Sequence, residues 1–206
     1  MGDGPYKLDQ SQAPFLKGLS GYMKEGVVPF HTPGHKQGRA LDPELKNALG
    51  LRPFALDVSD EIFAPDKFHD SLLVQKEAEA LAADAFGANR SFFLHNGTTV
   101  GIHAMLMAAS WCQKHHGDNF GGRKGEVVMP RSAHSSVFGG LILSGLTPRF
   151  VPEAWEPNWM MPLPPTTEAW RNTLDESPGL VAVLDTYPNY YGLGGNLLRI
   201  AQQARE

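Results

Sequence analysis

The chain has 206 residues, of which 42% are hydrophobic and 19% charged, and a formal net charge of -4 at pH 7. This length suffices for one large domain, or a domain with a small appendage, with a sizeable core. The slight acidic excess argues against nucleic acid as a partner, and no apolar run approaches the ~20 residues that a membrane-spanning helix needs. The one cysteine, Cys112, excludes an intrachain disulfide, and the absence of an apolar leader indicates a cytoplasmic protein.

The first part of the chain is expected to be irregular. Apolar residues at helical spacing within residues 13–26 predict a short arm helix. Residues 29–38 hold two prolines and two glycines, too many for a regular element, and predict a shaped loop. Asp42 followed by Pro43 is typical of a helix N-cap and first helical position, so a short helix that ends at Gly50 is expected.

Helices and strands are expected to alternate from residue 71 onward, which is typical of a mostly parallel sheet with crossover helices. The 3.6-residue period of apolar side chains predicts helices over residues 71–88, 100–115, 133–145 and 166–177, and another from about residue 196. Runs of β-branched and aromatic residues predict strands at residues 91–95, 126–130, 147–152 and 179–188.

A polar loop, "HNGTTVG" at residues 95–101, follows the first predicted strand and opens a helix. Backbone N–H groups and hydroxyls at a helix start form an anion site that the helix dipole reinforces, and a phosphate would fit there. The alternative is an ordinary N-cap, in which Thr98 or Thr99 serves only its own helix. The spacing alone leaves both interpretations open.

The loop "RSAHSSV" at residues 131–137 repeats this arrangement after the next strand. The loops at the carboxyl ends of neighbouring parallel strands face one crevice, where open α/β sheets bind their ligands. The imidazole of His134 could therefore lie flat against an aromatic ring that the first loop holds. The alternative is a partly exposed residue at a helix start.

Two further segments carry polar residues. The acidic segment at residues 56–70 lacks the spacing of a calcium loop and has no paired histidines, so no metal site is expected there. The segment "DTYPNYYGLGGN" at residues 185–196 follows a strand and is rich in Tyr, Asn and Gly. It is interpreted either as the lining of a pocket or as a turn with surface tyrosines.

Five motifs occur here in the order found in the ornithine/lysine/arginine decarboxylase family: "PFHTPGHKQG", "DEIFAPDKFH", "FGANRSFFLHNGTTVG", "PRSAHSSVFGGLILSG" and "YPNYYG". From about Pro29 to its end the chain resembles the amino-terminal part of that family's major domain. The resemblance implies an α/β fold of the aminotransferase-like type (fold type I), with a mostly parallel, incomplete sheet. It also implies an N-terminal arm with entrance loops at residues 1–60 and a partial cofactor domain at residues 61–206.

The resemblance implies pyridoxal 5'-phosphate (PLP) as cofactor. It assigns Asn96, Gly97, Thr98 and Thr99 to cofactor binding, the last three at the phosphate. It also implies that His134 stacks on the pyridine ring and that Ser136 helps to hold the phosphate end.

Other positions are implied as substrate or subunit contacts: His35, Lys36, Asp57, Glu61 and Tyr190. Members of the family form dimers with shared active sites, so a homodimer or a higher oligomer is expected of the complete protein.

Two family motifs are missing from this chain. The family aspartate that pairs with the ring nitrogen lies in a "DEAHG"-like segment, and its Schiff-base lysine lies in an "SxHK"-like segment, both after the tyrosine loop. Asp185 and Lys36 are not expected to replace them, because both stand too early in the family's order. The chain is therefore expected to be a fragment that is inactive alone.

Three residues also depart from the family pattern: Ser135 stands in place of a lysine, Asn189 in place of a threonine and Asn196 in place of an aspartate.

The function that the resemblance implies for the full-length protein is decarboxylation of arginine, lysine or ornithine to an amine, a polyamine precursor, and CO2. Which basic amino acid is the substrate stays open. One alternative hypothesis is a non-catalytic binding or regulatory protein with the same fold. Another is a different fold-type-I PLP enzyme, an aminotransferase or a lyase.

Overall fold

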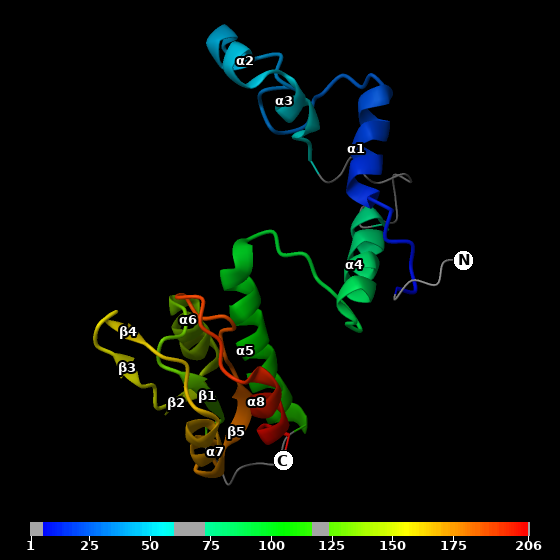
Figure 1. Ribbon diagram of the computed structural model, residues 1–206. Coiled ribbons are helices and arrows are strands. Elements are labelled where there is room, and N and C mark those ends of the chain that lie inside the picture. Colours follow the sequence, from blue (N-terminus) through cyan, green and yellow to red (C-terminus); the bar gives the residue numbers. More distant parts are fainter. Residues whose placement is uncertain (1–5, 60–72, 117–123, 206) are drawn as a thin grey trace. The chain divides into compact units, whose positions relative to one another are not determined.

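The computed structural model of the chain describes residues 6–59, 73–116 and 124–205. The chain divides into two compact units between Phe93 and Leu94, and each is described here by itself (Figure 1). The domain boundary expected near residue 60 lies outside the described residues and stays a prediction.

The first unit is helical. It contains α1 (Pro14–Lys24), α2 (Pro43–Leu49), α3 (Arg52–Leu56) and α4 (Leu73–Phe86), and α1 packs against α4. The helices predicted near residues 13–26, 43–49 and 71–88 are confirmed, and α3 was not predicted. Asp42 caps α2, because its carboxylate accepts the backbone N–H of Glu44 at 2.8 Å.

Asp84 ties the amino-terminal segment to α4. Its carboxylate accepts the backbone N–H groups of Lys7 at 3.0 Å and Leu8 at 2.9 Å, and the side-chain amide of Gln10 at 3.0 Å. These hydrogen bonds lower the pKa of Asp84 below its ordinary value, and the bond from the backbone of Leu8 has the largest effect. A short segment without regular structure is thereby fixed to the helix.

The prediction of a strand at residues 91–95 is wrong. None of these residues is in a strand, and Phe92 and Leu94 are 65% and 49% exposed. The backbone N–H of Phe93 donates to the Glu79 carboxylate at 3.1 Å instead of to a strand. An apolar run becomes a strand only where another strand offers hydrogen-bond partners, and the described residues supply none here.

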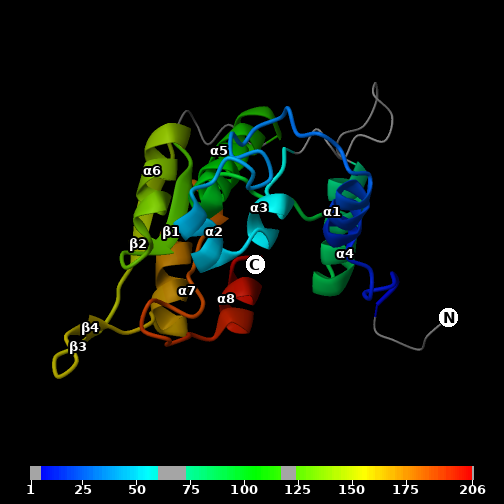
Figure 2. The ribbon, with the colours of Figure 1, turned by 90° about the horizontal axis from the view of Figure 1, so that it is seen from above.

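The second unit is a three-layer α/β structure. Its sheet has the order β2-β1-β5, all parallel, from β1 (Glu126–Pro130), β2 (Thr147–Val151) and β5 (Leu180–Val183). Helices α5 (Gly97–His116) and α6 (Ser135–Ser144) cover one face, and α7 (Thr167–Asp175) and α8 (Leu197–Gln203) cover the other (Figure 2). These seven elements were all predicted, and the α/β fold class is confirmed.

The core of the second unit follows from the alternation of side chains along β1. On one face Val127 and Met129, both fully buried, pack in a cluster with Leu106, Val137 and Leu141 of α5 and α6. On the other face Val128 packs with three residues of β2, α7 and α8, namely Val151, Trp170 and Ile200. The sheet is therefore apolar on both faces, as parallel sheets covered by helices are.

A small antiparallel hairpin after β2 was not predicted. It consists of β3 (Trp155–Glu156) and β4 (Met161–Pro162), with Met160 in the left-handed region at φ 50°. Two-residue strands are too short for the period of side chains to reveal them.

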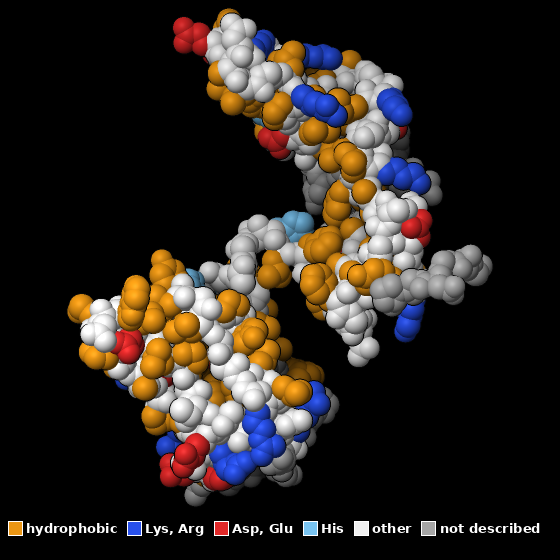
Figure 3. Space-filling view, viewed as in Figure 1, with side chains coloured by type: hydrophobic (Ala, Val, Ile, Leu, Met, Phe, Trp, Pro, Cys, Tyr) orange, Lys and Arg blue, Asp and Glu red, His pale blue; other side chains and the backbone are white. Residues whose placement is uncertain are grey.

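Hydrophobic side chains also lie at the surface of both units (Figure 3). In the second unit they include Ile142, Trp159 and Met160, which are 82%, 77% and 74% exposed. Among the helices that the structure describes, none combines the length and the apolar character needed to cross a membrane.

Candidate functional site

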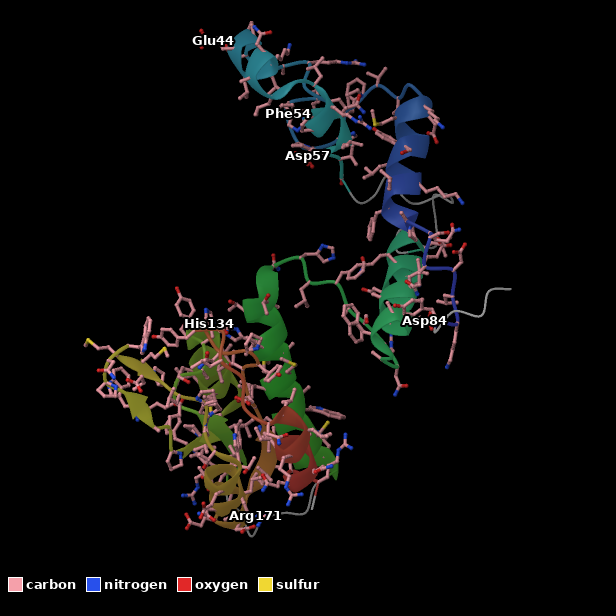
Figure 4. All side chains as sticks on the ribbon, viewed as in Figure 1. Glu44, Phe54, Asp57, Asp84, His134 and Arg171 are labelled. Atoms are coloured by element: carbon pink, nitrogen blue, oxygen red, sulfur yellow. The ribbon has the colours of Figure 1, made fainter. Side chains whose placement is uncertain are left out.

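A cavity of about 440 Å³ opens at one edge of the second unit. Because β1 and β5 are parallel, their carboxyl ends reach the same edge of the sheet, and the amino-terminal ends of α5 and α6 meet them there. The residues that line the cavity come from three places. They are Thr98, Thr99, Ile102 and Met105 of α5, then His134, Ser136 and Val137 of α6 and its cap, and Leu184, Asp185, Thr186 and Tyr187 after β5. Figure 4 shows His134 at this edge.

His134 is the N-cap of α6. Its Nδ1 accepts the backbone N–H of Ser136 at 3.2 Å and lies 2.8 Å from the Ser136 hydroxyl, which donates to it. With Nδ1 as acceptor, the neutral ring carries its proton on Nε2. Ser136 is buried, whereas His134 is exposed and lines the cavity. The same side chain therefore caps the helix and turns its ring toward the cavity.

The amino-terminal end of α5 forms another wall. Thr98 and Thr99 line the cavity in the first turn of this 20-residue helix, so their hydroxyls and the free N–H groups of the turn are available to a ligand. Gly97 begins the helix with φ 76°, which favours glycine, and open space surrounds the position of its missing Cβ. Neither Gly97 nor Asn96, which precedes the helix, is among the residues that line the cavity, so the cofactor roles expected of these two residues stay predictions.

Asp185 brings a carboxylate into the cavity wall just after β5. One of its oxygens accepts the backbone N–H of Thr186 at 2.8 Å. Partial burial raises the pKa of Asp185 above its ordinary value, and the nearby Glu153 carboxylate raises it further. The order of family motifs gave Asp185 no role. Four consecutive residues after β5, Leu184 to Tyr187, line the cavity, so the position of Asp185 at the carboxyl end of a predicted strand is the signal that could have identified it.

The tyrosine loop contributes a different tyrosine from the one predicted. Tyr187 lines the cavity, whereas Tyr190 is 94% exposed, is not in the lining and packs edge-on against Tyr191 at a ring-centre distance of 5.5 Å. The role of Tyr190 in substrate or subunit contact stays a prediction.

In the first unit His35 is held by both ring nitrogens. Its Nδ1 accepts the backbone N–H of Gly38 at 3.2 Å, and its Nε2 lies 3.2 Å from the carboxylate of Asp57. The ring packs edge-on against Phe54, and Figure 4 labels Phe54 and Asp57. These contacts join the loop at residues 29–38 to the end of α3.

Lys36 is held inside the same loop. Its Nζ donates to the carbonyl of His31 at 2.6 Å and to that of Phe30 at 3.3 Å. The backbone of Lys36 lies in the left-handed region at φ 49°. Glu61, the last of the predicted contact residues, lies outside the described residues.

Comparison with known proteins decides the family. The family model described as "Orn/Lys/Arg decarboxylase, major domain" matches residues 13–206. The chain belongs to the Orn/Lys/Arg decarboxylase family. Among its relatives, the arginine decarboxylase of Halalkalibacterium halodurans is 32% identical over 193 residues, which are 94% of this chain and 37% of that protein. The arginine decarboxylase of Bacillus subtilis is 29% identical over 96% of this chain and 38% of its own length.

This Orn/Lys/Arg decarboxylase chain thus spans less than two fifths of those relatives. Among solved structures, the constitutive lysine decarboxylase of E. coli matches with a TM-score of 0.56 and 20% identity, over 84% of this chain and 25% of that one. The match confirms the expected decarboxylase fold, of which the chain contains a part.

Proposed function

We propose that the cavity of the second unit binds PLP and that the longer protein decarboxylates a basic amino acid to an amine and CO2. The observation that carries the proposal is the cavity itself, which unites a helix amino terminus with hydroxyls and an exposed imidazole. Family membership and the names of the relatives, arginine and lysine decarboxylases, support the reaction. Arginine is the favoured substrate, because arginine decarboxylases match over more of the chain than lysine decarboxylases do.

The residues present fit this cofactor. A cavity of about 440 Å³ is within the usual range of roughly 300–1,000 Å³ for small-molecule sites. The open space at Gly97 and the hydroxyls of Thr98 and Thr99 suit a phosphate at the start of α5. His134 offers the flat face of an aromatic ring, and such faces stack on other aromatic rings.

PLP would supply an electron sink for the electron pair that remains when the carboxylate leaves as CO2. The chain's own residues would bind and orient it. Thr98, Thr99 and the N–H groups of the first turn of α5 would neutralise the phosphate. Ser136 holds the His134 ring in one orientation through Nδ1, and the apolar wall of Ile102 and Val137 limits the access of water to the ring.

The first experiment separates the two tasks of His134. In His134→Asn the new side chain is itself a good helix cap, but it has no aromatic ring. Stacking contributes about 0.5–1.5 kcal/mol, so the dissociation constant for PLP should rise roughly two- to tenfold while α6 stays folded. PLP affinity is measured by quenching of intrinsic fluorescence, and helix content by far-UV circular dichroism.

His115→Asn is the matched control, because His115 is exposed and stacks on Trp111 in the last part of α5, away from the cavity lining. This control should bind PLP as the unchanged chain does. Equal PLP affinity in His134→Asn and His115→Asn would refute the ring contact. Absence of saturable PLP binding by the unchanged chain would refute the cavity as a PLP site.

A further inference from the structure

Glu153 holds the loop that leads into His134, although it does not itself line the cavity. The backbone N–H of Ser132 donates to one oxygen of the Glu153 carboxylate at 2.9 Å, and the Ser132 hydroxyl donates to the other oxygen. A carboxylate that accepts both donors of one residue fixes its backbone as well as its side chain. Ser132 is two residues before His134, so the contact fixes the segment that places the ring.

The contact joins the ends of two neighbouring strands. β1 and β2 pair in parallel up to Pro130 and Val151, and the chain continues for two residues beyond each of these to reach Ser132 and Glu153. Both residues therefore leave the sheet at its carboxyl edge, where the cavity opens. Glu153 thus links the β1–α6 loop to a strand that supplies none of the described lining residues.

The other anchors of this loop lie after Ser132. The side chain of Ala133 is buried in the cluster between β1 and the helices α5 and α6, and Ser136 bonds to Nδ1 of His134 at the start of α6. Ser132 itself is exposed, so packing does not hold it. Glu153 therefore fixes the loop on the side of the strands, and Ser136 fixes it on the side of the helix.

Charge pairing does not explain the position of Glu153. Arg149 of β2 pairs with Glu126 instead, and the ion pairs that the structure describes do not include Glu153. After burial, the Glu153 carboxylate is a further cause of the raised pKa of Asp185, which is an unfavourable interaction between two acids. The hydrogen bonds from Ser132 are thus the favourable contacts that the described residues give to Glu153.

We propose that Glu153 is a positioning residue: by holding Ser132, it keeps the His134 ring where it stacks on PLP. The inference rests on the proposed function, of which the ring contact is a part. Aromatic rings attract each other at centre distances of about 4.5–7 Å, so a small displacement of the loop is enough to weaken stacking. Because Glu153 does not line the cavity, its effect on PLP should pass through His134.

The test compares variants by PLP titration, followed by quenching of intrinsic fluorescence. Glu153→Ala removes both hydrogen bonds, whereas Glu153→Gln keeps an oxygen acceptor and removes the charge. Glu156→Ala is the matched control, because the Glu156 carboxylate also accepts a backbone N–H at 2.9 Å, but from Asn158 within the β3–β4 hairpin. Far-UV circular dichroism confirms that each variant folds.

Glu153→Ala should raise the dissociation constant for PLP by roughly two- to tenfold, as expected for loss of the ring contact. Glu153→Gln should bind PLP no more weakly than the unchanged chain, and Glu156→Ala should bind it equally well. Loss of a negative charge alone would favour the phosphate of PLP, so weaker binding by Glu153→Ala has the opposite sign to a charge effect.

A combination with His134→Asn tests whether the effect passes through the ring. Once the ring is absent, Glu153→Ala should weaken PLP binding no further, so the double variant should match His134→Asn alone. A loss in the double variant equal to the product of the two single losses would overturn the assignment. Unchanged PLP affinity in Glu153→Ala, or equally weak binding by Glu153→Gln, would overturn it too.

A second measurement needs no PLP. The NMR signals of the His134 ring should differ between Glu153→Ala and Glu153→Gln, which both lack the charge and differ in the hydrogen bonds to Ser132. The amide hydrogen of Ser132 should also exchange faster in Glu153→Ala. If the unchanged chain shows no saturable PLP binding, the proposed function fails, and identical ring signals in the two variants would then overturn the role of Glu153 separately.

Discussion

At the scale of single residues, His134 shows how one side chain can satisfy two interpretations that a sequence leaves open. Its Nδ1 caps α6 through the N–H of Ser136, and the exposed ring still lines the cavity. A cap needs one acceptor atom, whereas stacking needs a ring face, so the two tasks do not compete for the same atoms. Capping is thus an observed role, and stacking on a cofactor is the proposed one.

Asp185 should make the stability of the chain depend on pH even without a ligand. Its pKa is raised in the folded chain from an ordinary value of 3.8, so the folded state keeps a proton that the unfolded chain has already released. This contribution to stability is present below about pH 4 and is lost as the pH rises through the raised pKa. Asp185→Asn removes the titrating group, so the variant should not show this loss of stability with rising pH.

The measurement is the midpoint of thermal unfolding, Tm, from pH 4 to pH 7 for the unchanged chain, Asp185→Asn and the control Asp175→Asn, in which an exposed residue at the end of α7 is changed. The Tm of the unchanged chain minus that of Asp185→Asn should decrease as the pH rises. The corresponding difference for Asp175→Asn should stay flat. A pH-independent difference for Asp185→Asn would contradict the raised pKa.

At the scale of elements, the packing of α5 on α6 fixes the distance between the two helix starts that form the cavity. A Cβ at Gly140 would lie 2.6 Å from Cδ1 of Leu106 and 3.5 Å from Cα of His103. Farther along, the buried hydroxyl of Ser110 donates to the carbonyl of Ser144 at 2.9 Å. Glycine at residue 140 therefore permits an approach that a larger residue would prevent.

Gly140→Ala should reduce the free energy of unfolding by about 1–3 kcal/mol, the usual cost of overpacking a core. It should also weaken PLP binding, because the start of α6 is displaced relative to that of α5. Gly195→Ala is the control, since its Cβ would meet its nearest neighbours at an ordinary 3.8 Å. Urea unfolding measures the effect, and equal stability of the two variants would show that α6 is free to shift.

The elements themselves were largely predictable, because helix period, caps and strand composition are local properties. Asp42 caps the helix expected after it, and Thr166 caps the helix predicted at residues 166–177. One failure depended on pairing that composition does not show, and the other on strands too short to have a period. Residues 91–95 have the composition of a strand but no strand beside them, and the hairpin at Trp155–Pro162 exists through one short antiparallel pairing.

The candidate site was predicted in part for the same reason. The polar residues at the starts of α5 and α6 follow from recognisable loops, and Thr98, Thr99, His134 and Ser136 do line one cavity. The contribution of β5 depends on which side chains after the strand turn toward the cavity. That depends on the path of the chain after β5, where four consecutive residues, Leu184 to Tyr187, line the cavity without the alternation of a strand.

At the scale of the whole molecule, the residues of this chain that are assigned to the proposed cofactor site all belong to the second unit. Both hydrophobic clusters around β1 consist of residues from the second unit, and the same holds for the lining of the cavity. Fully buried side chains on both faces of the sheet, Met129 and Trp170 among them, give this unit a core of its own. A unit with its own core is able to fold alone.

A chain cut to residues 94–206 should therefore fold and bind PLP with the affinity of the 206-residue chain. Near-UV circular dichroism reports its packed aromatic residues, and fluorescence quenching reports PLP binding. Leu141→Ala, made in the short chain, should cost about 2–5 kcal/mol, because Leu141 is 5% exposed in the cluster between β1 and α6. A short chain without near-UV signal, or one whose free energy of unfolding is unchanged by Leu141→Ala, would mean that the packing of the second unit depends on residues 1–93.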